Sequence, residues 1–191
     1  FVVAPTSAGK TFIAHYLVRR TLVEDDDGVV LYVGPIRALV DQFWMETTAL
    51  YDKVYRPGVY RNDVAGKFYD DRWDELNTQV LVTMPEHMEA LLHAITALGL
   101  SSRIRAIVFD EVHNMFDVTS PMAAAWERVL LSLPAQYIAL SATVGDSTAF
   151  QNWLARIEAT LRPGHEVTSI VHNECYNDLA VLLWTPGSAA A

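Results

Sequence analysis

Residues 4–11 read Ala4-Pro5-Thr6-Ser7-Ala8-Gly9-Lys10-Thr11, and this stretch decides the fold because it has the composition of a phosphate-binding loop. A glycine-containing turn directs backbone N–H groups inward, and the helix that follows offers its N-terminal dipole to anions. Lys10 can reach the terminal phosphates, and the Thr11 hydroxyl can ligate Mg²⁺. We therefore predict that these eight residues bind a nucleoside triphosphate. Ala4 replaces the usual first glycine, but any small residue leaves room for the turn.

A second segment, Ile107-Val108-Phe109-Asp110-Glu111-Val112-His113, supplies the acidic partner of this loop. Its apolar residues are typical of a strand buried on both faces of a parallel sheet. Asp110 follows at the carboxyl end, where ligands bind in open α/β sheets, and it can hold magnesium. We predict that Glu111 orients and polarises the attacking water, so the catalytic candidates are Glu111, Asp110 and Lys10. The alternative is a solvated pair of loop carboxylates, which the upstream loop disfavours.

Strand-like and helix-like segments alternate along the chain, which predicts an α/β fold: a mostly parallel sheet with helices on both faces. The expected strands are the start to residue 3, 29–33, 54–59, 80–83, 106–110, 137–140, 166–171 and 179–184. The expected helices are 10–23, 37–50, 86–98, 122–133 and 147–159. The pattern weakens after residue 161, so we expect one domain over 1–161 and a trailing segment over 162–191.

Composition sets further bounds on the kind of protein. The chain has 191 residues, of which 51% are hydrophobic, and this is enough for one domain with a sizeable core. No apolar run is long enough to span a membrane. The only cysteine is Cys175, which excludes an intrachain disulfide and fits an intracellular, cytoplasmic location. The net charge of −9 argues against binding nucleic acid through a general basic field. We expect the acidic stretch 24–27 to lie in a solvated loop away from the site.

Three more segments follow expected strands, and so belong to the same rim of the sheet as Lys10 and Asp110. They are Gly34-Pro35-Ile36-Arg37-Ala38-Leu39-Val40-Asp41-Gln42, Thr83-Met84-Pro85-Glu86 and Ser141-Ala142-Thr143. Thr83 could offer hydroxyl and N–H donors to a phosphate, and Arg37 could add a charge-assisted contact. This clustering predicts a site distributed over several strand ends.

With all five segments in this order, the chain resembles the first RecA-like domain of superfamily II helicases. The Asp110-Glu111-Val112-His113 form is similar to the DExH branch, and the phosphate loop is similar to its superkiller-type members. Within that branch the chain most resembles the interferon-inducible DExD/H-box helicase group, a likeness that extends to Tyr176-Asn177-Asp178-Leu179.

This resemblance implies a RecA-like P-loop NTPase domain that uses ATP and Mg²⁺ and acts on RNA. It implies that residues coupling nucleotide state to nucleic-acid binding are His113, Ser141 and Thr143. It implies that residues touching the nucleic-acid backbone are Pro35, Arg37, Ala38, Gln42, Thr83, Pro85 and Glu86. Full activity would need a second RecA-like domain of the same polypeptide, which brings arginine fingers. Met84 interrupts the tighter Thr-Pro-Glu form of the family.

Two other functions remain open at this point. A DNA helicase or translocase of the same superfamily would make the same backbone contacts, since only the 2′-hydroxyl separates RNA from DNA there. A nucleotide-sensing interaction module without turnover is the alternative of another class, which the intact Lys10, Thr11, Asp110 and Glu111 disfavour.

Overall fold

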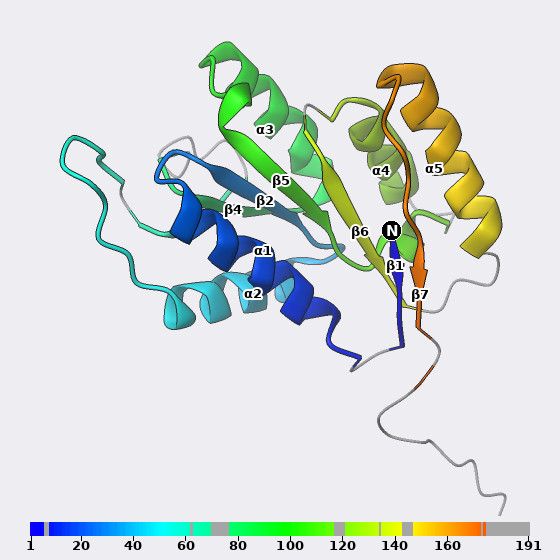
Figure 1. The fold of residues 1–191 in the computed structure, drawn as a ribbon, viewed down its shortest axis with the longest axis horizontal. Coiled ribbons are helices and arrows are strands. Elements are labelled where there is room, and N and C mark those ends of the chain that lie inside the picture. The colour runs from blue at the N-terminus through cyan, green and yellow to red at the C-terminus, as the bar shows by residue number, and fades with distance from the viewer. Residues whose placement is uncertain are drawn as a thin grey trace, which may run out of the picture.

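The computed structural model describes residues 1–5, 8–61, 63–69, 77–116, 121–133, 135–142, 147–172 and 174. Its centre is a seven-stranded sheet in the order β3-β4-β2-β5-β6-β1-β7, and every described strand pair is parallel (Figure 1). The strands are β1 (Val2–Val3), β2 (Val29–Val33), β3 (Ala65–Lys67), β4 (Val80–Thr83), β5 (Ile104–Phe109), β6 (Tyr137–Ser141) and β7 (Ile170–Val171). The predicted α/β fold with a mostly parallel sheet is confirmed.

Helices cover both faces of this sheet (Figure 1). They are α1 (Lys10–Glu24), α2 (Arg37–Leu50), α3 (Pro85–Ala97), α4 (Pro121–Leu131) and α5 (Ser147–Leu161), with short 3₁₀ turns η2 (Ser101–Arg103) and η3 (Val112–Phe116). The predicted bounds of α2 are confirmed, and those of the other helices differ by one or two residues at one or both ends. Such differences are usual, because helix ends fray.

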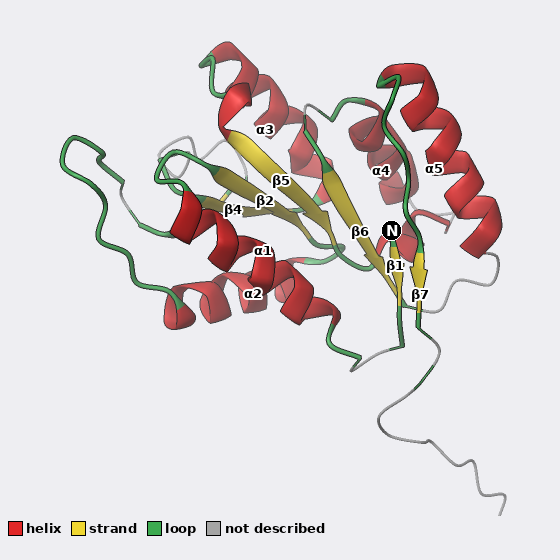
Figure 2. Cartoon of the chain, in the orientation of Figure 1, coloured by secondary structure: helices red, strands yellow, loops and turns green. Residues whose placement is uncertain are grey.

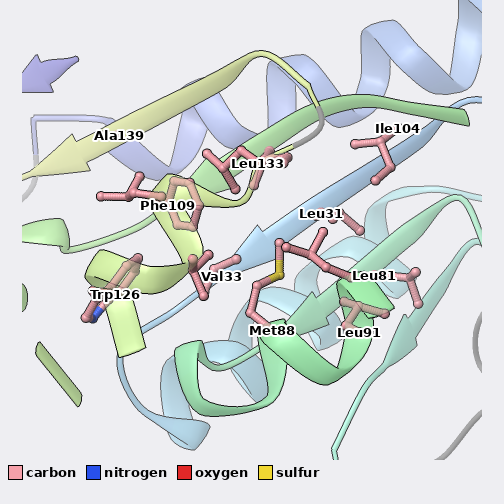
Figure 3. Close-up of a cluster of buried hydrophobic side chains, with 14 of the residues drawn as sticks. Leu31, Val33, Leu81, Met88, Leu91, Ile104, Phe109, Trp126, Leu133 and Ala139 are labelled. Atoms are coloured by element: carbon pink, nitrogen blue, oxygen red, sulfur yellow. The ribbon is translucent and has the colours of Figure 1, made fainter. Parts of the chain in front are cut away.

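Side-chain alternation along β2 divides the core into two clusters. Leu31 and Val33 face the cluster built with α3, α4 and α5, whereas Val30 and Tyr32 face the cluster built with α1 and α2. Figure 3 shows the first cluster, where the Phe109 ring meets the edge of the fully buried Trp126 with 5.4 Å between ring centroids. Because both faces of β2 are covered, its sequence is continuously apolar rather than alternating.

The expected strand over 54–59 is wrong. These residues form part of a long loop between α2 and β3 (Figure 2), and the strand beside β4 is residues 65–67 instead. Pro57 and Gly58 make a turn closed by the Val59 N–H on the Arg56 carbonyl, and Val54 is 95% exposed. Valine and tyrosine favour a strand only where a pleated surface is there to pack against.

The acidic stretch before β2 is also not simply solvated, which corrects the expectation from sequence. Asp26 is paired with Lys53 at 2.8 Å and with Arg56, and these contacts lower the pKa of Asp26 to about 2. The neighbouring carboxylates, Asp25 and Asp27, pair with arginines of the 56–61 loop, of η2 and of β5: Arg61, Arg103 and Arg105. The stretch therefore anchors the long loop at the amino-terminal rim of the sheet, opposite the predicted site.

The segment after residue 161 begins by adding β7 to the sheet beside β1. Only two residues of the expected strand over 166–171 form it, and the one expected over 179–184 lies outside the described residues. The boundary at residue 161 stays a prediction.

Candidate nucleotide-binding site

The predicted site residues converge where β1, β5 and β6 end. β5 pairs with β6 and β6 with β1, and the Ala4 N–H donates to the Ser141 carbonyl at 3.0 Å. The loop after β1 therefore begins beside the end of β6, one strand away from Asp110. Neighbouring parallel strands place their carboxyl ends on one rim, so segments far apart in sequence come together there.

The phosphate loop turns into α1 at Gly9. Gly9 has φ of +86°, a left-handed conformation that glycine adopts without strain. Lys10 is only 7% exposed, and its Nζ donates to the carbonyl oxygens of Ala4 at 3.1 Å and Pro5 at 3.3 Å. Thr11 is exposed in the first turn of α1. Thr6 and Ser7 lie outside the described residues.

Asp110 follows β5 and is 8% exposed. Its Oδ2 accepts the Tyr32 hydroxyl at 2.6 Å, and its Oδ1 accepts the Glu111 N–H at 2.9 Å. Burial raises the pKa of Asp110, and the Tyr32 hydrogen bond acts against that increase. The chain thus holds a buried carboxylate in a fixed orientation at the rim.

Glu111 is the centre of the polar contacts at the site. Its Oε1 lies 3.7 Å from Lys10 Nζ, and its Oε2 lies 3.2 Å from His113 Nδ1 and 3.3 Å from the Ala142 N–H that donates to it. Its φ of +50° is unusual for a non-glycine residue, and the Asn114 side-chain amide donates to its carbonyl at 2.8 Å. The carboxylate is therefore held between the phosphate loop and the end of β6.

The predicted coupling residues lie next to Glu111. His113 Nδ1 is 3.4 Å from the hydroxyl of Ser141, the last residue of β6. Thr143 lies outside the described residues. The structure thus brings two of the three predicted coupling residues into one network with Glu111.

The predicted nucleic-acid contacts at the start of α2 differ in accessibility. Arg37, Ala38 and Gln42 are exposed, whereas Pro35 is buried. The Arg37 guanidinium lies 5.1 Å from the centroid of the Tyr69 ring and 3.7 Å from Asp41. Gln42 donates to Glu46 at 2.8 Å. Tyr69 thus supports an exposed cation at this rim.

Thr83 does not present its hydroxyl to solvent, which corrects that part of the prediction. The residue is fully buried, and its hydroxyl donates to the Phe68 carbonyl at 2.9 Å. Pro85 is buried as the first residue of α3, and Glu86 is exposed. The Thr83 hydroxyl instead joins the end of β4 to the residue after β3.

Sequence reasoning missed Tyr32, Asn114 and Tyr69 as residues of this rim. Tyr32 lies in the apolar strand β2, in which its hydroxyl is the only polar side-chain group. That hydroxyl was the available signal, because a buried phenol normally has a hydrogen-bond partner.

The best-formed cavity among the described residues lies away from the predicted site. A cavity of about 550 Å³ is lined by Asp25, Arg105 and Gln136, which lie where strands begin, on the opposite rim. Among the described residues no three His, Cys, Asp or Glu side chains form a metal-holding group. Within the same part of the chain no helix has the length and apolarity needed to cross a bilayer.

Comparison with known proteins shows the family of the chain. The family model for DEAD/DEAH box helicases matches residues 1–151. The chain belongs to the DEAD/DEAH box helicase family. As a helicase domain of this family, it contains the predicted phosphate loop and Asp-Glu pair within the matched region.

Two similar helicases are the human "Probable ATP-dependent RNA helicase DDX60-like" and the "Antiviral helicase SKI2" of Saccharomyces cerevisiae. The human protein is 33% identical over 93% of this chain, and the yeast protein is 30% identical over 82%. The chain covers 10% and 11% of these two proteins, so it spans about a tenth of their length. The predicted resemblance to superkiller-type DExH helicases is confirmed.

A solved structure with the same fold is that of the DUF1998 helicase MrfA bound to DNA and AMPPNP. It aligns with a TM-score of 0.62 over 88% of this chain and 24% of that chain, at 19% sequence identity. At that identity the likeness shows the fold, which is the RecA-like helicase core.

Proposed function

We propose that this chain is the ATP-binding motor domain of an ATP-dependent RNA helicase, in which ATP hydrolysis is coupled to RNA binding or remodelling. The observation that carries the proposal is the 3.7 Å approach of Lys10 Nζ to Glu111 Oε1, beside the buried Asp110. A phosphate-binding cation and a candidate water-activating carboxylate face each other across the rim. A module that only sensed nucleotide would not need Glu111 in this position.

Triphosphate binding would change the contacts of Lys10. Its ammonium group now contacts two loop carbonyls, and phosphate oxygens would replace them as stronger, charged acceptors. Gly9 allows the backbone to turn, and α1 begins at the same place without a side-chain cap, so its N-terminal dipole is available to an anion. The loop therefore has both the positive charge of Lys10 and the helix dipole for the anion.

The donor set fits magnesium. Mg²⁺ prefers oxygen ligands and is commonly held by one or two protein groups together with substrate phosphates. Asp110 offers a carboxylate at the end of β5, and Thr11 offers a hydroxyl in the first turn of α1. The ion would neutralise charge on the phosphates, while Glu111 orients and polarises the attacking water.

Nucleic acid would bind along the rim that carries Arg37. We assign RNA rather than DNA because the human relative is named as an RNA helicase. A second RecA-like domain of the same polypeptide would form the other wall of the cleft. Competition between single-stranded RNA and DNA of the same sequence tests this choice, measured on the longer protein, by which we mean a polypeptide that contains this chain and the proposed second RecA-like domain. Equal affinity with equal stimulation of hydrolysis by both would contradict it.

Lys10→Ala tests nucleotide binding. We expect a loss of about 2–5 kcal/mol, roughly 30- to 4,000-fold in affinity, because the variant removes a buried charge from the phosphates. Titration with a fluorescent ATP analogue and Mg²⁺ measures it. Arg128→Ala removes one positive charge from a surface pair with Glu89 and is the matched control. Near wild-type affinity in folded Lys10→Ala would contradict the phosphate-loop assignment.

Arg37→Ala tests the nucleic-acid contact. The exposed guanidinium would meet a phosphate, so its loss should weaken RNA binding about equally across sequences and reduce the salt slope by about one. Affinities at several salt concentrations measure both effects. The control is Arg20→Ala, which removes an exposed arginine that pairs with Glu24 on α1. A loss confined to some sequences would rule out a backbone contact.

A further inference from the structure

Tyr32 links Asp110, the carboxylate predicted to bind magnesium, to the core of the domain. Its side chain is 2% exposed, and its hydroxyl donates to Asp110 Oδ2 at 2.6 Å. Tyr32 lies on β2, which is paired with β5, the strand that carries Asp110 at its end. The phenol therefore reaches the carboxylate from within the core, not from solvent.

The hydrogen bonds on Asp110 fix its orientation. Oδ2 accepts the phenol, and Oδ1 accepts the Glu111 N–H at 2.9 Å. Each oxygen of an ionised carboxylate has two acceptor positions, so each keeps one for a cation or a water bound to a cation. The two donors thus leave the outward side of the carboxylate free to act as a ligand while preventing its rotation.

The Tyr32 ring is itself held by a stack of aromatic side chains. It lies parallel to the Phe43 ring of α2, with 3.7 Å between centroids and 2° between planes. Phe43 stacks in turn on His15 of α1, with 4.6 Å between centroids, and His15 Nε2 contacts Glu46 at 3.3 Å. One continuous series of contacts therefore joins Asp110 to the two helices on that face of the sheet.

The Tyr32 phenol is well suited to donate a hydrogen bond to the Asp110 carboxylate. The Tyr32 hydroxyl is buried and lies 2.6 Å from Asp110 Oδ2, and a phenol O–H facing a carboxylate oxygen donates the hydrogen bond. A buried carboxylate is costly to keep ionised unless donors surround it. Outer partners of metal ligands orient them and typically change metal affinity by about 10- to 100-fold.

We propose that Tyr32 is a positioning residue for magnesium binding, which fixes Asp110 through the 2.6 Å hydrogen bond and is held in place by its stack on Phe43. This inference rests on the proposed function, since it assigns Tyr32 to the same nucleotide site. It adds that Tyr32 of β2 and Phe43 of α2 partly determine how nucleotide binding depends on the Mg²⁺ concentration. β2 then contributes Tyr32 to the nucleotide site and leads into α2, the helix predicted to contact RNA.

The test is equilibrium binding of a fluorescent ATP analogue to the 191-residue chain, titrated with Mg²⁺ and repeated in EDTA. Tyr32→Phe removes one hydroxyl and keeps the ring stack. We expect it to raise the Mg²⁺ concentration at half-maximal binding by about 10-fold or more and to leave the affinity in EDTA within twofold of wild type. Tyr51→Phe is the matched control, because its hydroxyl donates to the His15 carbonyl at 3.0 Å on the same face without touching Asp110.

The outcomes separate the inference from the proposed function. An unchanged Mg²⁺ midpoint in folded Tyr32→Phe would overturn the inference alone. An equal loss of affinity with and without Mg²⁺, or an equal effect of Tyr51→Phe, would reduce Tyr32 to a structural role and overturn it too. If the wild-type chain bound no nucleotide at any Mg²⁺ concentration, both the function and the inference would fail.

Discussion

Glu111→Gln should retain ATP binding and lose hydrolysis by at least about 100-fold, and by up to ~10,000-fold. The amide has the shape of the carboxylate, but it cannot polarise water as a base. Asp110 keeps its own donors, the Tyr32 hydroxyl and the backbone N–H of residue 111, so magnesium binding is preserved. Lys10 also keeps its two loop carbonyls. The variant should therefore separate binding from turnover.

The measurement is single-turnover ATP hydrolysis by the longer protein with saturating RNA, beside the dissociation constant for ATP and Mg²⁺. Glu127→Gln is the control, because it makes the same chemical change on the exposed side of α4. Unaffected turnover in Glu111→Gln would show that another group activates the water. A loss of ATP affinity equal to the loss of rate would show that Glu111 acts mainly through its contact with Lys10.

The parts of the fold that the sequence predicted share a physical cause. Strands β2 and β4 match the prediction because both of their faces are buried, so the apolar run and the strand coincide. The phosphate loop and the Asp110-Glu111 pair could be found because their chemistry requires particular residue types at fixed positions. Parallel pairing then brings these two segments to one rim.

The parts that the sequence did not predict depend on contacts between distant residues. Residues 54–59 have strand-like composition, but ion pairs between the 56–61 loop and Asp26 and Asp27 hold them away from the sheet. The Thr83 hydroxyl was expected to meet a phosphate, and it binds the Phe68 carbonyl instead. A local sequence pattern does not show which distant residue will lie close enough to form an ion pair or a hydrogen bond.

Tyr32 shows the same limit within the site itself. Because Tyr32 belongs to an apolar strand, the sequence predicted only that it packs in the core, and its ring does pack on Phe43. Its bond to Asp110 exists because β2 and β5 are neighbours in register, a fact that belongs to the sheet order rather than to either segment. A search for buried phenols near predicted carboxylates would have suggested it.

The 191-residue chain should hydrolyse ATP some 10³- to 10⁵-fold more slowly than the longer protein with RNA, the range that an arginine finger contributes to phosphoryl transfer. In the described part of the chain the nitrogen-containing side chains that form ion-pair contacts with Glu111 are Lys10 and His113, and neither is an arginine. Three other arginines form ion pairs with carboxylates at the opposite rim of the sheet: Arg61, Arg103 and Arg105. We expect the finger to come from a second RecA-like domain.

Single-turnover rates of the two proteins, with and without RNA, measure this difference. A binding titration with ATP and Mg²⁺ is the control, because the chain should still bind nucleotide weakly through its own loop and Asp110. Its RNA stimulation should be small, since we propose that a second domain forms the other wall of the cleft and the net charge of −9 repels phosphates. Rapid, RNA-stimulated turnover by the 191 residues alone would refute a site shared between two domains, because every group needed for catalysis would then have to lie in this one.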